Sequence, residues 1–186
     1  MAHTSQPIRV YLAGPDVFHP QARQLGDEKK SICAALGLMG VFPLDETVSG
    51  NGMTPAEHGI AISAKDARLA RSCDAVLVNL TPYLGPSMDV GTAVELGLMV
   101  GLGKPAFGYT NKASDFAGRV ADFGAPVGWK TENFGLTDNL MVDGMINASG
   151  GRVIVPERDL PFEDMTTFTD AATALAKHLG ENDRAE

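Results

Sequence analysis

Residues 75–80 read Ala-Val-Leu-Val-Asn-Leu, and this short apolar run is the segment that decides the fold. Apolar residues at consecutive positions are typical of a strand that helices cover on both faces. Residues 8–13 (Ile-Arg-Val-Tyr-Leu-Ala) form a second such run, which ends before a Gly-Pro pair. Shorter apolar runs complete a set of five predicted strands, at 41–44, 105–109 and 153–155.

Longer segments with helical periodicity separate these strands. Predicted helices occupy residues 21–36, 55–72, 90–102 and 162–179, and two more are expected near 113–123 and 137–147. Thr54 and Glu57 have capping-box spacing at the start of the second helix, and Asp89 can cap the third. Strands that alternate with helices predict a parallel sheet with right-handed crossovers. We therefore predict an α/β fold with a flavodoxin-like, doubly wound five-stranded parallel sheet in the order 2-1-3-4-5.

Length and composition limit the class of protein. A chain of 186 residues predicts a single domain over residues 1–186, with one sizeable core. The most apolar window, residues 90–102, contains Glu95 and three glycines and is too short and polar to span a bilayer. The first nine residues are polar and have no signal-peptide pattern, so the expected location is cytoplasmic.

The charge of the chain restricts its partners. A formal net charge of −8 argues against nucleic acid or an anionic membrane, because phosphate contacts need clustered Lys and Arg. A neutral small molecule is compatible with this charge. Cys33 and Cys73 lack CxxC spacing and are expected to be reduced core residues. The four histidines are scattered, so we expect no metal and no cofactor.

In a sheet of this order, ligands bind beyond the carboxyl ends of the strands, at the switch point between the first and third strands. The loops at 14–18 and 81–88 flank that point. Four polar residues are expected to converge there: Tyr11, Asp66, Asp89 and Glu95. Glu95 is the most informative of them, because a carboxylate among apolar neighbours is costly unless it is paired, hydrogen-bonded or used in chemistry.

Each of these residues alone also fits a purely structural role. Glu95 could be a core or interface residue satisfied by Tyr11, which would itself be an ordinary core tyrosine. Asp89 could be only a helix cap, and Asp66 could be a surface charge paired with a basic neighbour. The case for chemistry therefore depends on their combination.

Together, three segments resemble nucleoside 2-deoxyribosyltransferases. They are Tyr-Leu-Ala-Gly-Pro at 11–15, Lys-Asp-Ala-Arg followed by Cys-Asp-Ala-Val within 65–76, and Asp-Val-Gly-Thr-Ala-Val-Glu-Leu-Gly at 89–97. The third is the most specific, since many α/β proteins end a strand with Gly-Pro. The resemblance continues through 42–45 and 139–141 and covers most of the chain up to residue 147.

The resemblance implies roles for the four polar residues. It implies that Glu95 is the nucleophile, that Tyr11 orients it, and that Asp66 and Asp89 contact the sugar and the base. It also implies a set of substrate-binding residues: Gly14, Phe18, Asp45, Asn139 and Met141. Because Asn139 would reach the substrate of a neighbouring subunit, a homo-oligomer with shared sites is expected.

The expected reaction is the transfer of 2-deoxyribose from a deoxynucleoside to a free purine or pyrimidine base. Breaking the N-glycosidic bond builds positive charge on the sugar, and a carboxylate that bonds to it would store the sugar with overall retention. One alternative is a deoxynucleoside 5′-monophosphate N-glycosidase on the same fold, with Ser87 available for the phosphate. Another is a nucleotide-sensing module without enzymatic activity.

The loop at 48–54 offers no evident base-reading residue, and the chain ends in a polar tail, Gly180–Glu186.

Overall fold

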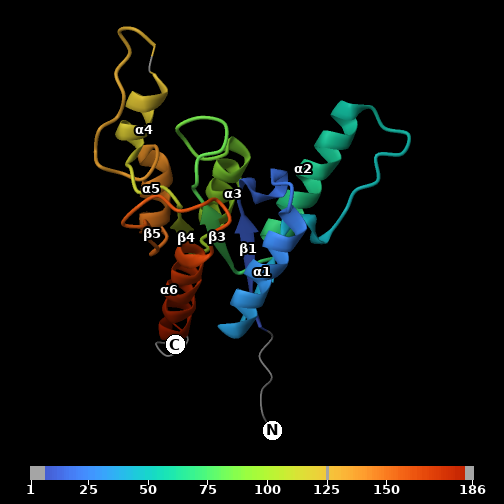
Figure 1. The fold of residues 1–186 in the computed structure, drawn as a ribbon. Helices are drawn as coiled ribbons and strands as arrows, with labels where there is room; N and C mark the ends of the chain where they lie inside the picture. The colour runs from blue at the N-terminus through green and yellow to red at the C-terminus, as the bar shows by residue number, and fades with distance from the viewer. Residues whose placement is uncertain (1–6, 125, 183–186) are drawn as a thin grey trace.

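The computed structural model of the chain describes residues 7–124 and 126–182. Within this part, five parallel strands form one sheet in the order β2-β1-β3-β4-β5 (Figure 1). The strands are β1 (Ile8–Ala13), β2 (Leu38–Val41), β3 (Ala75–Asn79), β4 (Ala106–Tyr109) and β5 (Val153–Ile154). The predicted α/β class and the flavodoxin-like strand order are confirmed.

Helices cover both faces of this sheet. They are α1 (Ala22–Ala35), α2 (Pro55–Arg71), α3 (Val90–Gly101), α4 (Phe116–Phe123), α5 (Leu140–Ala148) and α6 (Thr166–Asn182). Residues of α2, α3 and α5 share one buried cluster with one face of the sheet, and residues of α1 and α6 share a second cluster with the other face. Two 3₁₀ turns follow the first two strands: η1 (Pro15–Phe18) and η2 (Pro43–Asp45).

The alternation of side chains along β1 decides which of its residues point to the face of the sheet that α3 covers. Val10 and Leu12 belong to the cluster with α1 and α6, whereas Tyr11 and Ala13 belong to the cluster with α3. Tyr11 is paired in register with Val76 of β3 and is fully buried. The strand period therefore directs the tyrosine ring toward the face that α3 covers.

The predicted starts of α2 and α3 are confirmed. Thr54 and Glu57 form the capping box of α2, with Glu57 N–H donating to Thr54 Oγ1 at 3.3 Å. Asp89 caps α3 by accepting a hydrogen bond from the backbone N–H of Thr92 at 2.9 Å. This cap fixes Asp89 at the first turn of α3 and places Glu95 in the middle of the same helix.

Two predicted elements lie elsewhere in the structure. The second strand occupies 38–41 instead of 41–44. It begins directly after Gly37 (φ 77°), which follows the end of α1, and Pro43, which has no N–H for a ladder, begins η2. The last helix begins at Thr166 instead of 162, because Asn111 Nδ2 donates to three carbonyls in the preceding loop, those of Pro161, Phe162 and Asp164.

Smaller corrections concern helix ends. Asp115 and Asn139 cap α4 and α5, so these helices begin at 116 and 140, later than expected. In the expected polar tail, Gly180–Asn182 belongs to α6, and residues 183–186 lie outside the described part. Both cysteines are buried free thiols, as predicted. Of the helices in the described residues, none has the length and apolar character that crossing a bilayer requires.

Candidate active site

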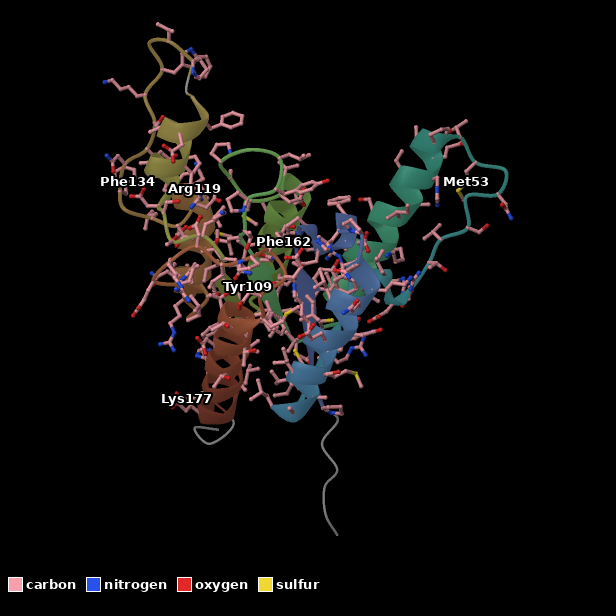
Figure 2. All side chains as sticks on the ribbon, viewed as in Figure 1. Met53, Tyr109, Arg119, Phe134, Phe162 and Lys177 are labelled. Atoms are coloured by element: carbon pink, nitrogen blue, oxygen red, sulfur yellow. The ribbon has the colours of Figure 1, made fainter. Side chains whose placement is uncertain are left out.

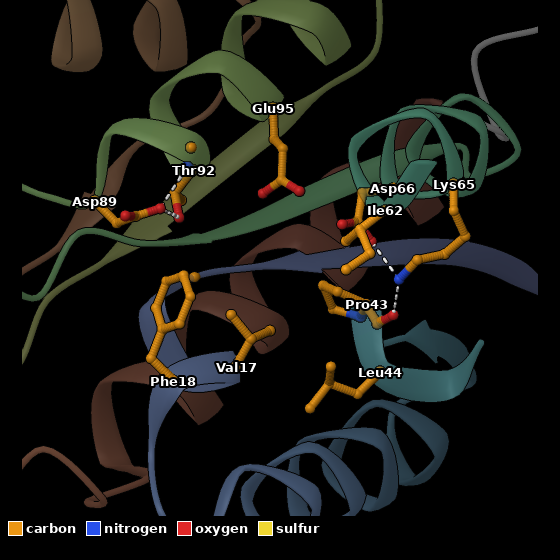
Figure 3. Close-up of a pocket in the computed structure, with 12 residues that line it drawn as sticks. Val17, Phe18, Pro43, Leu44, Ile62, Lys65, Asp66, Asp89, Thr92 and Glu95 are labelled. Atoms are coloured by element: carbon orange, nitrogen blue, oxygen red, sulfur yellow. Dashed lines mark hydrogen bonds and ion pairs between the residues drawn. The ribbon is translucent and has the colours of Figure 1, made fainter. Parts of the chain in front are cut away.

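A cavity of about 330 Å³ opens beyond the carboxyl ends of β1 and β2, between α2 and α3 (Figure 3). The segments η1 and η2 form its other sides. Its lining residues are Gly14, Val17, Phe18, Pro43, Leu44, Ile62, Lys65, Asp66, Asp89, Gly91, Thr92 and Glu95. The cavity therefore brings together residues from four segments that are far apart in the sequence.

Glu95 projects from the middle of α3 into this cavity (Figure 3). The hydroxyl of Tyr11 donates a hydrogen bond to Glu95 Oε1 at 2.5 Å, from behind the cavity. Tyr11 does not line the cavity itself. One carboxylate oxygen of Glu95 is thus held by a buried donor, which fixes the orientation of the whole group.

The surroundings of Glu95 change its protonation behaviour. Burial raises the pKa of Glu95 to about 7, and the negative charges of Asp66 and Asp89 add to this rise, while the hydrogen bond from Tyr11 and the charge of Lys65 oppose it. Burial and the neighbouring Glu95 raise the pKa of Tyr11 far above its ordinary value. Tyr11 therefore stays protonated as a donor, whereas Glu95 changes charge near neutral pH.

Asp89 and Thr92 form one corner of the cavity. Asp89 Oδ2 accepts hydrogen bonds from the backbone N–H and the hydroxyl of Thr92, at 2.9 and 3.0 Å. Both of these bonds use the same carboxylate oxygen. The helix cap thereby fixes the Asp89 side chain at the edge of the cavity, on the same helix as Glu95.

Asp66 faces Glu95 from α2, and the neighbouring Lys65 side chain turns toward Pro43 (Figure 3). Lys65 Nζ lies 2.6 Å from Asp66 Oδ1 and also donates to the carbonyl of Pro43. Asp66 Oδ1 is buried, and the ion pair with Lys65 is its polar contact among the residues that the structure describes. Lys65 and Asp66 of α2 are thereby tied to η2 beside the cavity.

The apolar wall of the cavity consists of Val17, Phe18, Leu44 and Ile62. Phe18 is half exposed and stacks on Tyr83, with ring centroids 5.3 Å apart and planes at 10°. Tyr83 belongs to the loop that the strand order placed beside the site. A flat apolar surface beside the carboxylates is suited to a planar, weakly polar group.

Sequence reasoning predicted Gly14 and Phe18 in this cavity but missed several lining residues: Val17, Leu44, Ile62, Lys65 and Thr92. A signal existed for two of them. Ile62 precedes Asp66 by one helical turn and therefore lies on the same face of α2. Thr92 lies one turn after Asp89, where a helix cap brings the two residues together.

Three predicted substrate-binding residues do not line the cavity of this single chain. Asp45 accepts hydrogen bonds from Phe42 N–H at 2.9 Å and from Lys30 Nζ at 2.7 Å, and so supports the turn η2. Asn139 caps α5, its Oδ1 accepting from Met141 N–H at 3.0 Å. Met141 is 60% exposed on the surface of α5.

Ser87, which the phosphate-binding alternative invoked, is also outside the cavity lining. Its hydroxyl donates to the buried carboxylate of Asp138, which also accepts from Met88 N–H at 2.8 Å. The serine therefore serves to fix the loop before α3. Across residues 7–124 and 126–182, no three His, Cys, Asp or Glu side chains gather in a group that could hold a metal ion.

Comparison with known proteins gives consistent findings. A family model described as nucleoside 2-deoxyribosyltransferase matches residues 10–141, a range that includes all four polar residues of the site. An uncharacterised protein of Schizosaccharomyces pombe is 35% identical over 193 residues, which cover 91% of this chain and 89% of that protein.

Two solved structures are similar in fold. The 2-desoxiribosyltransferase from Leishmania mexicana is 26% identical, with a TM-score of 0.67 over 92% of this chain and 99% of that one. A conserved protein from Enterococcus faecalis V583 is 17% identical, with a TM-score of 0.56 over 89% of this chain and 96% of that one. The second likeness concerns the fold alone.

Proposed function

The chain belongs to the nucleoside 2-deoxyribosyltransferase family, and from this premise we propose that it transfers 2-deoxyribose between purine or pyrimidine bases. The observation that carries the proposal is Glu95, a carboxylate that faces the cavity, is held by Tyr11 and has a pKa of about 7. Perturbed carboxylates in a cleft are candidates for chemistry. The reaction would serve nucleoside salvage in the cytoplasm, within a single domain.

In the proposed first step, ionised Glu95 attacks C1′ of the deoxyribose. A C–O bond forms, the C–N bond to the base breaks, and the electron pair stays on the base nitrogen, which takes a proton from Asp66 or Asp89. A second base then attacks C1′, gives its proton back to the Asp carboxylate that protonated the first base, and releases Glu95 as a carboxylate. Two inversions at C1′ give overall retention, as in retaining glycosidases. No cofactor is required.

The cavity residues divide between the two parts of the substrate in this proposal. The sugar would lie between Asp89 and Glu95 on α3, because carboxylates are good acceptors for sugar hydroxyls. The base would lie against the apolar wall, beside Phe18 and near Asp66. Gly14 would allow close approach of the substrate, and Asp45 would act through the turn η2.

The pH dependence offers a test of the pair Tyr11 and Glu95. Because Glu95 must be ionised to attack, kcat/KM should fall as the pH drops below about 7. Tyr11→Phe should slow the reaction by about 10–100-fold, since one orienting hydrogen bond is lost. The same change should move the acid limb to higher pH, because the hydrogen bond from Tyr11 lowers the pKa of Glu95. The measurement is kcat/KM against pH for both proteins; an unchanged rate and limb would leave Tyr11 as a core residue only.

We also propose a homo-oligomer, at least a dimer, in which Asn139 and Met141 reach the substrate of a neighbouring subunit. Exposed apolar residues on α3 and α5 support this, because Val90 and Val94 are 79% and 71% exposed and Met141 lies on the packed neighbour helix. Light scattering should detect the oligomer, and Met141→Glu should weaken both assembly and turnover. Lys177→Glu, at an exposed polar position of α6, is the control. An active monomer at assay concentration would contradict the proposal.

The proposed activity is tested by incubating the protein with deoxyinosine and free adenine or cytosine, followed by chromatography. Transfer predicts hypoxanthine together with deoxyadenosine or deoxycytidine. An N-glycosidase would release hypoxanthine and free deoxyribose without a new nucleoside. A sensing module would bind the nucleoside without any turnover. The transferase, the N-glycosidase and the sensing module would therefore give three different chromatograms.

A further inference from the structure

A buried ion pair lies directly behind the cavity. Asp16 of η1 is 2% exposed, Lys29 of α1 is 3% exposed, and Lys29 Nζ lies 2.6 Å from Asp16 Oδ1. Neither residue lines the cavity, and neither takes part in the proposed reaction. Two buried charges are expensive to desolvate unless further hydrogen bonds satisfy them.

Both charges have such partners. Lys29 Nζ donates to the hydroxyl of Tyr109 at 2.6 Å and lies 5.3 Å from the ring centroid of Phe168. Asp16 Oδ2 accepts a hydrogen bond from Asn79 Nδ2 at 3.0 Å. Tyr109 ends β4 in the interior of the molecule (Figure 2), and Asn79 ends β3. The pair thus ties η1 to α1 and to the ends of two central strands.

The turn that this cluster holds is the one that builds the cavity. Gly14, Val17 and Phe18 line the cavity on either side of Asp16 in the sequence. The fit is close, because a Cβ added at Gly14 would lie 2.4 Å from Asp16 Oδ2 and 2.7 Å from Asn79 Cβ. A shift of Asp16 would therefore displace the residues that face the ligand.

We propose that Asp16 and Lys29 are positioning residues for base binding: their ion pair holds η1 so that Val17 and Phe18 present a fixed apolar surface to the base. This inference rests on the proposed function. A buried pair contributes little net stability compared with apolar side chains of similar size. Its distinctive contribution here is geometric, because one hydrogen-bonded arrangement fixes the turn against three other elements.

The test is the double variant Asp16→Asn/Lys29→Met, which removes both charges at nearly constant volume. The KM for a deoxynucleoside should rise about tenfold while kcat stays within about twofold, because contacts of the base with η1 are made equally in the ground state and the transition state. A variant that merely loses folded protein would show the opposite pattern, a lower kcat at an unchanged KM. That pattern, or unchanged kinetics, would overturn the proposal.

Two further variants make the result decisive. Tyr109→Phe removes only the hydroxyl that accepts from Lys29 and keeps the ring, so it should fold and raise the KM by about 2–5-fold. If the double variant does not fold, Tyr109→Phe tests the positioning role on its own, and an unchanged KM would then refute the proposal. Thr167→Val, which removes a buried hydrogen bond to Asn111 away from the cavity, is the control and should leave the KM unchanged. Absence of turnover in the wild-type protein would instead refute the proposed function.

Discussion

Glu95→Gln should reduce turnover by about 10³-fold or more while the protein stays folded. The amide has nearly the shape of the carboxylate and can still accept the hydrogen bond from Tyr11. It cannot form the proposed glycosyl ester, so the loss should appear in kcat. The measurement is single-turnover and steady-state kinetics of purified protein with a deoxynucleoside. Retention of more than a tenth of the wild-type rate would rule out Glu95 as the nucleophile.

The same variant should be more stable than the wild type at alkaline pH. The pKa of Glu95 is about 7 in the folded protein, against an ordinary value of 4.5, so folded protein binds more protons than unfolded protein between these values. The free energy of unfolding of the wild type should therefore decrease by about 1–3 kcal/mol as the pH rises through this range. Gln carries no charge and avoids this loss. Glu28→Gln, at an exposed position of α1, is the matched control and should change neither rate nor stability.

Deoxynucleosides should be used at least about 100-fold better, in kcat/KM, than their 5′-monophosphates. Three carboxylates line the cavity: Asp66, Asp89 and Glu95. Lys65 is the one cation among its described lining residues, and it is already paired with Asp66 and bonded to the carbonyl of Pro43. A phosphate dianion would meet like charge in a partly desolvated site. The family resemblance adds the expectation that ribonucleosides are also poor substrates.

A side-by-side assay of a deoxynucleoside, its monophosphate and its ribo-analogue measures this preference. If the monophosphate were the best substrate, the N-glycosidase alternative would replace the transferase. Lys65 would then be the first residue to change, because the hydroxyl of Ser87 is already bound to Asp138. Lys65→Met should then abolish the preference for phosphate, whereas in a nucleoside transferase it should leave discrimination against phosphate intact or stronger.

Local patterns in the sequence were sufficient for much of the fold. The consecutive apolar residues of β1 and β3 and the caps at Thr54 and Asp89 depend on neighbours in the chain, and these elements lie where they were predicted. The start of α6 was mispredicted because it depends on Asn111, about fifty residues away, whose side chain holds the preceding loop. No periodicity within one segment carries that information.

The candidate site likewise contains residues that the sequence can identify and residues that only the folded structure identifies. Glu95 could be singled out because a carboxylate in an apolar helix is unusual, and the structure places Asp66 and Asp89 in the same cavity. Leu44 could not, because an apolar residue just after a strand has the same appearance whether it faces a core or a ligand. The pairing of Asp16 with Lys29 likewise depends on how η1 docks on α1, which only the folded chain determines.

The proposed covalent intermediate on Glu95 can be tested by peptide mass spectrometry of the protein quenched in acid during turnover of a deoxynucleoside without an acceptor base. With no second base to remove the sugar, the glycosyl-enzyme should accumulate. The peptide containing Glu95 should gain the mass of one 2-deoxyribosyl group, and the gain should disappear on adding a free base and in Glu95→Gln. Consumption of the nucleoside with no sugar ever found on Glu95, together with full activity of Glu95→Gln, would contradict it.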